Sequence, residues 1–102
     1  MPLSFTSKVA GVTFENRQVL VSKVQQGEFI GLLREPDNKY DKNAIKVMNQ
    51  HGMQLGYIPK DLARDLAKYM DLGISFNAVC KYPTGGSDGL SYGLVIEIME
   101  VV

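Results

Sequence analysis

The sequence predicts a mainly β domain of the α+β class: a small antiparallel β-barrel with one clear helix at about residues 59–72 and a second, short helix at about residues 16–25. Three observations predict this class. Several short β-favouring segments are separated by turn residues, one amphipathic segment lies late in the chain, and 102 residues suffice for one modest core. We therefore expect residues 1–102 to form a single domain.

The first part of the chain predicts a strand and then a short helix. Residues 4–14 (SFTSKVAGVTF) alternate and end in β-favouring residues, which indicates a first strand. Residues 15–28 are ambiguous, because three valines favour a strand whereas two polar residues and a closing glycine favour a helix. These residues are Val19, Val21 and Val24 on one side and Asn16, Gln18 and Gly27 on the other. We predict the short helix.

The middle of the chain predicts three strands. Residues 29–35 (FIGLLRE) form a β-favouring run that Pro36 ends, since proline lacks the N–H that a sheet needs. Residues 44–58 (AIKVMNQHGMQLGYI) predict a hairpin that turns at His51 and Gly52.

Residues 59–72 predict the clearest helix. Pro59 suits the first helical position, and Gly73 suits the position just past the end. Apolar side chains recur with helical spacing and form one stripe, made of Leu62, Leu66, Tyr69 and Met70. A basic stripe runs along the same segment, made of Lys60, Arg64 and Lys68. The basic stripe is either a solvated helix face or a rim that faces phosphates.

The end of the chain predicts a second hairpin. Residues 74–82 and 90–102 are β-favouring runs, and the glycine-rich segment PTGGSDG joins them. Together with the earlier strands and the late helix, they indicate a small closed barrel that the helix caps.

Composition excludes several classes of protein. Lys and Arg total 11 and Asp and Glu total 11, so the net charge is zero. Proteins that coat long phosphate backbones carry a basic excess, so we do not expect this chain to bind along an extended phosphate backbone. The one cysteine, Cys80, has no partner for an internal disulfide, and we interpret it as a buried small hydrophobe in a reducing compartment. No apolar run is long enough to span a membrane and MPLSFTSK lacks a signal-peptide core, so we expect a cytoplasmic protein without a membrane partner.

The sequence predicts no metal site, no cofactor and no catalytic residues. One cysteine and one histidine cannot supply a Cys/His zinc site. Residues 37–41 resemble the start of a calcium loop, but Lys39 occupies a ligand position and Met48 stands where the loop needs a glutamate. TGGSDG lacks the lysine of a phosphate-binding loop, and His51 has no serine or carboxylate tied to it by a local pattern. We therefore expect a binding protein and not an enzyme.

The segment REPDNKYDKNAIKV, residues 34–47, carries more side-chain chemistry than a connection between strands needs. Four basic and three acidic residues leave one net positive charge, too little to hold a long phosphate chain. One interpretation is a structured turn in which side chains satisfy local backbone N–H groups, namely those of Asp37, Asn38, Asp41 and Asn43. That interpretation leaves Tyr40 unexplained, and the alternative is a ligand that needs a ring, amides and a carboxylate.

Three segments of the chain form a recognisable combination: VAGVTF, LLREPDNKYDKNAIKV and GMQLGYIPKDLARDLAKYMD. From about Phe5 to the last strand, the chain resembles the HIRAN domain, whose core motif R-E-P-D-N-x-Y-D-x-N-A-I-x-V and later G-Y-I-P-x-x-L-A element are both matched. It looks like a small stand-alone bacterial member of a family whose module elsewhere lies beside SNF2-type helicase motors. The resemblance implies an OB-like or SH3-like barrel that binds single-stranded DNA at a free 3′-hydroxyl end, as in DNA repair and replication-fork proteins.

The resemblance also implies which residues hold the DNA. Asn38, Tyr40 and Asp41 match family positions that hold the terminal nucleotide. The other matching positions are Phe14, a family aromatic; Thr13, where the helicase-like member has a basic residue; Tyr57, where some members have histidine; and Lys60, a basic position near the DNA. One late-loop aromatic lines the family's pocket, and Tyr82 and Tyr92 are both candidates.

These residues suggest how a DNA end is held. We expect Phe14 and Tyr40 to stack on a terminal base, and Asp41 to accept a hydrogen bond from the 3′-hydroxyl while it repels a phosphate. The expected partners are single-stranded DNA 3′ ends and, in trans, a helicase or another DNA-processing protein. Two alternatives stay open: a protein-interaction adaptor without nucleic-acid binding and, as the weaker one, a hydrolase that acts on nucleic-acid ends.

Overall fold

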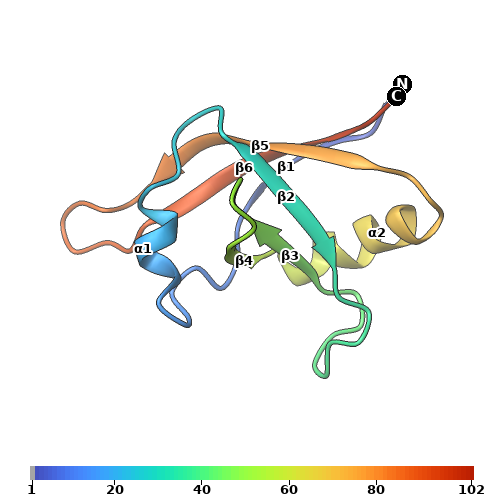
Figure 1. Cartoon of the computed structure of the whole chain (residues 1–102), viewed down its shortest axis with the longest axis horizontal. Helices are drawn as coiled ribbons and strands as arrows, with labels where there is room; N and C mark the ends of the chain where they lie inside the picture. The colour runs from blue at the N-terminus through green and yellow to red at the C-terminus, as the bar shows by residue number, and fades with distance from the viewer. Residues whose placement is uncertain (1) are drawn as a thin grey trace.

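The computed structural model of the chain describes residues 2–102, which form six strands and two helices (Figure 1). In chain order the elements are β1 (Ser4–Lys8), α1 (Arg17–Val21), β2 (Phe29–Arg34), β3 (Ile45–Met48), β4 (Gln54–Tyr57), α2 (Lys60–Asp71), β5 (Phe76–Thr84) and β6 (Gly93–Glu100). Neither of these described helices is long and apolar enough to cross a membrane.

The strands pair antiparallel in one curled sheet, in the order β1-β6-β5-β2-β3-β4. The long strands β5 and β6 run side by side, and β3 and β4 form a short hairpin at the far edge (Figure 1). The curl brings the two edges together: Ala10, just after β1, exchanges both main-chain hydrogen bonds with Tyr57 of β4, at 2.8 and 2.9 Å. The predicted mainly β fold is confirmed. The sheet is curled into a half-barrel, and the Ala10–Tyr57 bridge joins its two edges.

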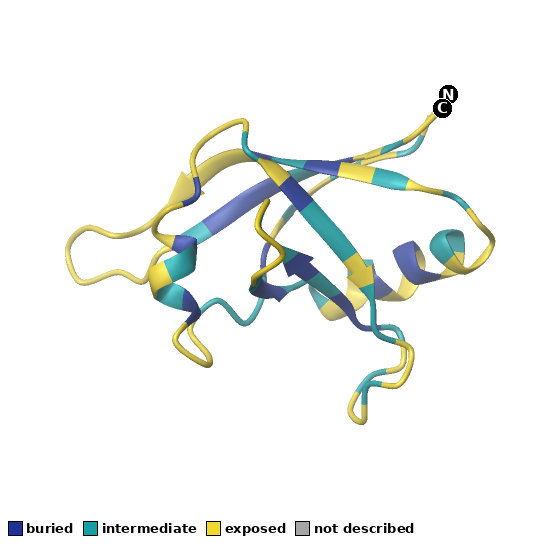
Figure 2. Cartoon of the chain, viewed as in Figure 1, coloured by how far each residue is buried: buried dark blue, intermediate teal, exposed yellow. Residues whose placement is uncertain are grey.

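Buried aliphatic residues of the strands and of α2 belong to one hydrophobic core. Figure 2 shows the buried positions along the strands and on α2. Ile96 and Ile98 of β6 are fully buried, as expected for alternate residues that face a core. From α2, Leu66 of the predicted stripe is fully buried, and its burial contributes about 1.5–3 kcal/mol. Ala63 and Ala67 are buried beside it, since their small side chains let the helix pack closely.

Most predicted elements are confirmed within one or two residues. The run at 29–35 is β2, and residues 44–58 form the β3–β4 hairpin, whose turn at His51 and Gly52 is held by Asn49. The helix predicted at 59–72 is α2. The last strand begins at Gly93 and not at residue 90, because the residues before it belong to the exposed hairpin loop.

The first strand and the first helix are shorter than predicted. β1 ends at Lys8 and does not continue to Phe14. The chain turns at Gly11, which has φ 71°, and Glu15 and Asn16 are also left-handed, with φ 55° and 61°; a strand has none of these angles. The loop formed here (the β1–α1 loop, residues 9–16) and the β2–β3 loop (residues 35–44) project from the same side of the molecule (Figure 2). The exposed parts of the two loops include residues 13–16 and residues 36, 37, 39 and 40.

Gly56 permits the close approach that closes the barrel. A Cβ at this position would lie 2.3 Å from the carbonyl oxygen of Ala10 and 2.8 Å from Cγ1 of Val9. Both separations are shorter than van der Waals contact, so only glycine lets the segment after β1 rest directly on β4.

We expect Gly56→Ala to lower the free energy of unfolding by about 2–3 kcal/mol, because the added methyl group must push the Val9–Ala10 segment away from β4. Urea unfolding followed by circular dichroism measures the change. Gly31→Ala in β2 is the matched control: its Cβ would meet Met48 at 3.4 Å, so we expect a loss of about 1 kcal/mol or less. Equal losses in the two variants would contradict the close approach at Gly56.

Candidate functional site

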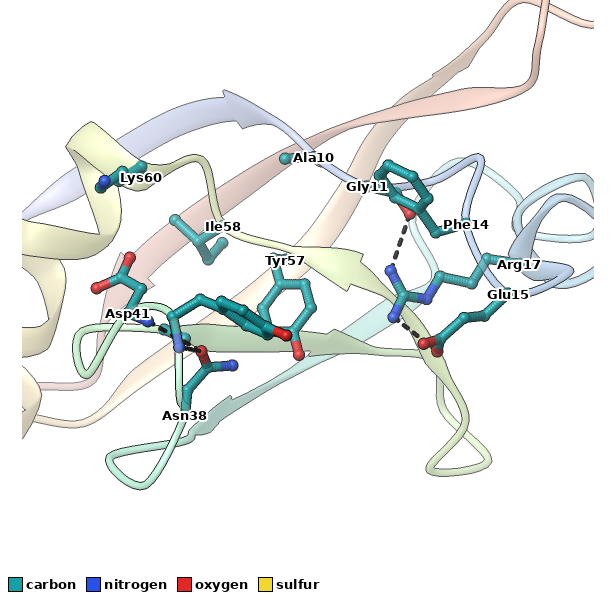
Figure 3. A pocket seen from close by; sticks show the side chains of 12 residues that line it. Ala10, Gly11, Phe14, Glu15, Arg17, Asn38, Asp41, Tyr57, Ile58 and Lys60 are labelled. Atoms are coloured by element: carbon teal, nitrogen blue, oxygen red, sulfur yellow. Dashed lines mark hydrogen bonds and ion pairs between the residues drawn. The ribbon is translucent and has the colours of Figure 1, made fainter.

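The β1–α1 loop, the β2–β3 loop and the end of β4 surround a cavity of about 670 Å³ (Figure 3). Tyr57 lies in the middle of this cavity in Figure 3, with Asp41 and Lys60 at one end and Phe14 and Arg17 at the other. The two loops meet at one cavity because the Ala10–Tyr57 bridge brings the segment after β1 beside β4, the strand that pairs with β3.

Arg34, the last residue of β2, fixes the β2–β3 loop to α2. Its Nε and Nη2 donate to the two carboxylate oxygens of Asp71, both at 3.0 Å, and this bidentate geometry is the strongest that an arginine makes with a carboxylate. Its Nη1 donates to the carbonyl oxygens of Lys42 and Ala44, also at 3.0 Å. The Arg34 guanidinium also holds the pKa of Asp71 below its ordinary value.

Glu35 joins the same loop to the floor of the cavity. One of its oxygens accepts hydrogen bonds from the Asn38 amide and, at 3.0 Å, from the Tyr57 hydroxyl. The other oxygen pairs with the Lys46 ammonium at 2.9 Å. The Asn38 amide first, and then Lys46 and Tyr57, lower the pKa of the Glu35 carboxyl. The ring of Tyr57 is therefore held in place from its hydroxyl end.

Asn38 and Asp41 hold the backbone of their own loop. Asn38 Oδ1 accepts hydrogen bonds from the N–H groups of Tyr40 and Asp41, and Asp41 Oδ1 accepts one from the N–H of Asn43, all at 2.9 Å. The structured turn is thus confirmed for these two side chains, whereas Asp37 and Asn43 form no side-chain hydrogen bond within residues 2–102. The second carboxylate oxygen of Asp41 has no hydrogen-bond partner in that part of the chain.

Two aromatic rings line the cavity with most of their surface exposed. Tyr40 is 93% exposed and Phe14 is 66% exposed. Such rings normally bury about 150–250 Å² in a core or an interface. The Tyr40 side chain forms none of the hydrogen bonds described here for the β2–β3 loop, so these bonds do not require an aromatic side chain at this position.

Arg17 is a site residue that the sequence did not predict. It is the first residue of α1, and only 7% of it is exposed, although it lines the cavity. Its Nη1 donates to the Gly11 carbonyl at 2.9 Å, its Nη2 pairs with Glu15 at 3.1 Å, and its guanidinium carbon lies 5.5 Å from the centre of the Tyr57 ring. The only signal in the sequence is a lone arginine that opens an otherwise uncharged helical segment, RQVLV.

Most of the predicted site residues line the cavity, namely Phe14, Asn38, Tyr40, Asp41, Tyr57 and Lys60. The cavity is not lined by Thr13, Tyr82 or Tyr92. The backbone of Tyr92 pairs with the side-chain amide of Gln18, at 2.7 and 2.9 Å, and its ring packs against Gly86 in the β5–β6 loop. These contacts hold Tyr92 at the base of the hairpin.

The remaining candidate residues lie outside this cavity. His51 borders a smaller cavity of about 310 Å³ between α1 and the β3–β4 turn. Cys80 is buried, and its burial raises the pKa of the thiol. Within residues 2–102, no three His, Cys, Asp or Glu side chains are grouped so that they could hold a metal ion.

The hydrogen bonds of Glu35 make stability depend on pH. Because its pKa in the folded protein lies below the ordinary value of 4.5, its contribution is complete above that pH and is lost as the pH falls through the lowered value. We expect the free energy of unfolding of the wild type, measured in urea, to fall from about pH 5 to about pH 3, and Glu35→Gln to weaken this dependence. Asp71→Asn should weaken it independently, because Arg34 lowers the pKa of Asp71. An unchanged pH dependence in Glu35→Gln would contradict the prediction.

Comparisons with known proteins show the family of this chain. The protein-family model of the HIRAN domain matches residues 3–99 of this chain. The helicase-like transcription factor of Oryctolagus cuniculus is 56% identical over 48 residues, which are 47% of this chain and 5% of that protein. The chain therefore spans only a small part of the length of this curated relative.

Two solved structures extend the similarity to nearly the whole chain. The crystal structure of the HIRAN domain of human HLTF is 31% identical with a TM-score of 0.75, over 95% of this chain and 74% of that chain. An NMR structure of the HLTF HIRAN domain in its DNA-bound conformation is 32% identical with a TM-score of 0.63, over 94% of this chain and 74% of that chain. The chain thus belongs to the HIRAN domain family.

Proposed function

We propose that this chain is a DNA-binding module that captures single-stranded DNA at a free 3′-hydroxyl end. The observation that carries the proposal is Tyr40, a residue that is 93% exposed and lines the cavity on a loop that side-chain hydrogen bonds order. A relative of the same family adopts a DNA-bound conformation, which supports DNA as the ligand.

The exposed rings contribute affinity that does not depend on which base is bound. A nucleobase that stacks on an aromatic side chain contributes about 1–3 kcal/mol, whatever its identity. Tyr40 and Phe14 come from different loops and line one cavity, so a terminal base that enters it has two rings within reach. Because the β2–β3 loop is already ordered by Arg34, Glu35 and Asn38, binding requires little further ordering of the loop.

Asp41 supplies selectivity for the end of the strand. Its second carboxylate oxygen is free to accept a hydrogen bond, and it lines the cavity. A sugar hydroxyl can donate to this oxygen, whereas a phosphate on the same sugar would place two negative charges together. Strand interiors and 3′-phosphorylated ends therefore bind less well than a free 3′-hydroxyl.

The cavity is built for very few phosphates. Lys60 and Arg17 are its two cationic side chains, and Glu15 and Asp41 are its two carboxylates. With so few cations, the strand is held near its terminus and not along its length, in agreement with a chain of zero net charge.

We expect Tyr40→Ala to weaken binding of a short single-stranded oligonucleotide about tenfold, because one base stack is lost. Fluorescence anisotropy with a 5′-labelled strand measures the dissociation constant. Phe29→Ala is the matched control, since Phe29 is a 53% exposed aromatic residue outside the cavity, and we expect less than a twofold change there. Equal losses in the two variants would remove Tyr40 from the binding site.

We expect the wild type to bind a 3′-hydroxyl strand at least about tenfold more tightly than the same strand with a 3′-phosphate, and Asp41→Asn to abolish most of that preference. Asparagine keeps an oxygen for the N–H of Asn43, so the loop is preserved. Asp37→Asn is the control, because it removes the same charge from an exposed position in the same loop that does not line the cavity. Equal wild-type affinity for both ends would refute end recognition and leave general strand binding intact.

A further inference from the structure

Arg17 is the one charged residue that is buried within residues 2–102, and it is buried at the wall of the cavity. Its guanidinium is fixed on two sides, by the Gly11 carbonyl at 2.9 Å and by the face of the Tyr57 ring at 5.5 Å. A Cβ at Gly11 would lie 3.2 Å from Nη1, so the guanidinium lies directly against the backbone of the loop. Its position is therefore set by uncharged partners.

Glu15 provides the negative charge that a buried cation needs. The pair is a single contact of 3.1 Å between Nη2 and Oε2, and the Glu15 side chain is 78% exposed. Glu15 and Asn16 both have left-handed backbone angles, so the turn that places the carboxylate beside the guanidinium is strained. An exposed carboxylate held by one contact is easily displaced.

We propose that Arg17 binds one phosphate of the DNA strand and that Glu15 is its displaceable counter-ion when no strand is bound. This proposal rests on the DNA-end function proposed above. A phosphodiester offers the guanidinium two oxygens in the geometry that arginine prefers. It cannot share the Nη2 face with a carboxylate, because two anions would then stand side by side.

In this arrangement Glu15 competes with the DNA phosphate for Arg17 and so lowers the affinity for the strand. When the strand enters, the carboxylate turns out to solvent, which its exposure allows. Every bound strand must first displace this ion pair. Glu15 lowers most the affinity of a ligand that brings no phosphate to Arg17. Such a ligand would cover the guanidinium without replacing its counter-ion.

The test is the sign of the effect of Glu15→Gln on binding of the 3′-hydroxyl oligonucleotide in the anisotropy assay. If Glu15 competes with a phosphate, Glu15→Gln tightens binding about three- to tenfold. If Glu15 instead only holds Arg17 in position and does not compete with a phosphate, Glu15→Gln weakens binding or leaves it unchanged, and the proposal is overturned. Glu28→Gln is the control for the change in net charge, because Glu28 lies outside the cavity, and it should change affinity less than twofold.

A second arm identifies the phosphate. The same strands are prepared with an uncharged methylphosphonate at the linkage nearest the 3′ end, at the next linkage, or at both. We expect the gain from Glu15→Gln to disappear when the linkage that faces Arg17 is neutral. A gain that persists with both linkages neutral would show that no phosphate replaces Glu15, and would overturn the proposal.

The outcomes separate this proposal from the function on which it rests. If the wild type and Glu15→Gln both fail to bind any strand at concentrations up to about 1 mM, the DNA-end function fails and takes this proposal with it. If the wild type binds with the expected preference for a 3′-hydroxyl but Glu15→Gln brings no gain, only the counter-ion proposal fails. Glu15→Gln leaves the buried Arg17 without its counter-ion, so we expect the variant to unfold at a lower temperature than the wild type. Far-UV circular dichroism at the assay temperature shows whether the variant is folded and so excludes misfolding as the cause of a missing gain.

Discussion

The site depends on the two main-chain hydrogen bonds between Ala10 and Tyr57, which close the curled sheet. They require glycine at position 56, because any Cβ there would collide with the Ala10 carbonyl. Once the edges are joined, the β1–α1 loop and the β2–β3 loop are held on either side of Tyr57. Loops that are distant in sequence can then present Phe14 and Tyr40 to a single cavity, which neither loop could form alone.

The polar residues of the β2–β3 loop act mainly on the loop itself. Arg34 fixes its end to α2, Glu35 fixes it to Tyr57 and Lys46, and Asn38 orders the backbone on which Tyr40 stands. For the base stacking proposed above, this order would lower the entropic penalty of binding, because a flexible loop would first have to be ordered. The dense side-chain chemistry of this segment thus explains how one tyrosine can remain exposed in a defined position.

Sequence analysis predicted what depends on local pattern and missed what depends on tertiary contact. Alternating and β-favouring residues predicted the strands, and apolar residues at helical spacing predicted α2. The residue types also predicted that Asn38 and Asp41 accept hydrogen bonds from the N–H groups of their own loop. The end of β1 was predicted wrongly, because the alternation of residues 9–14 persists in a loop whose direction is set by left-handed backbone angles. Arg17 was missed for a related reason: the left-handed turn brings Gly11 to it, and Tyr57 becomes its neighbour only when β4 packs beside this loop.

The balance of charge in the cavity also bears on selectivity. Two cations and two carboxylates line it, so its attraction for a phosphate chain at long range is weak. In the function proposed above, affinity would then come from short-range contacts, namely stacking on the rings and hydrogen bonds to Asp41 and Arg17. Such contacts would need an unstacked base and an unblocked sugar hydroxyl together, as the terminus of a single strand offers them. A strongly basic cavity would bind more tightly but would accept any segment of the strand, because phosphates are the same along its whole length.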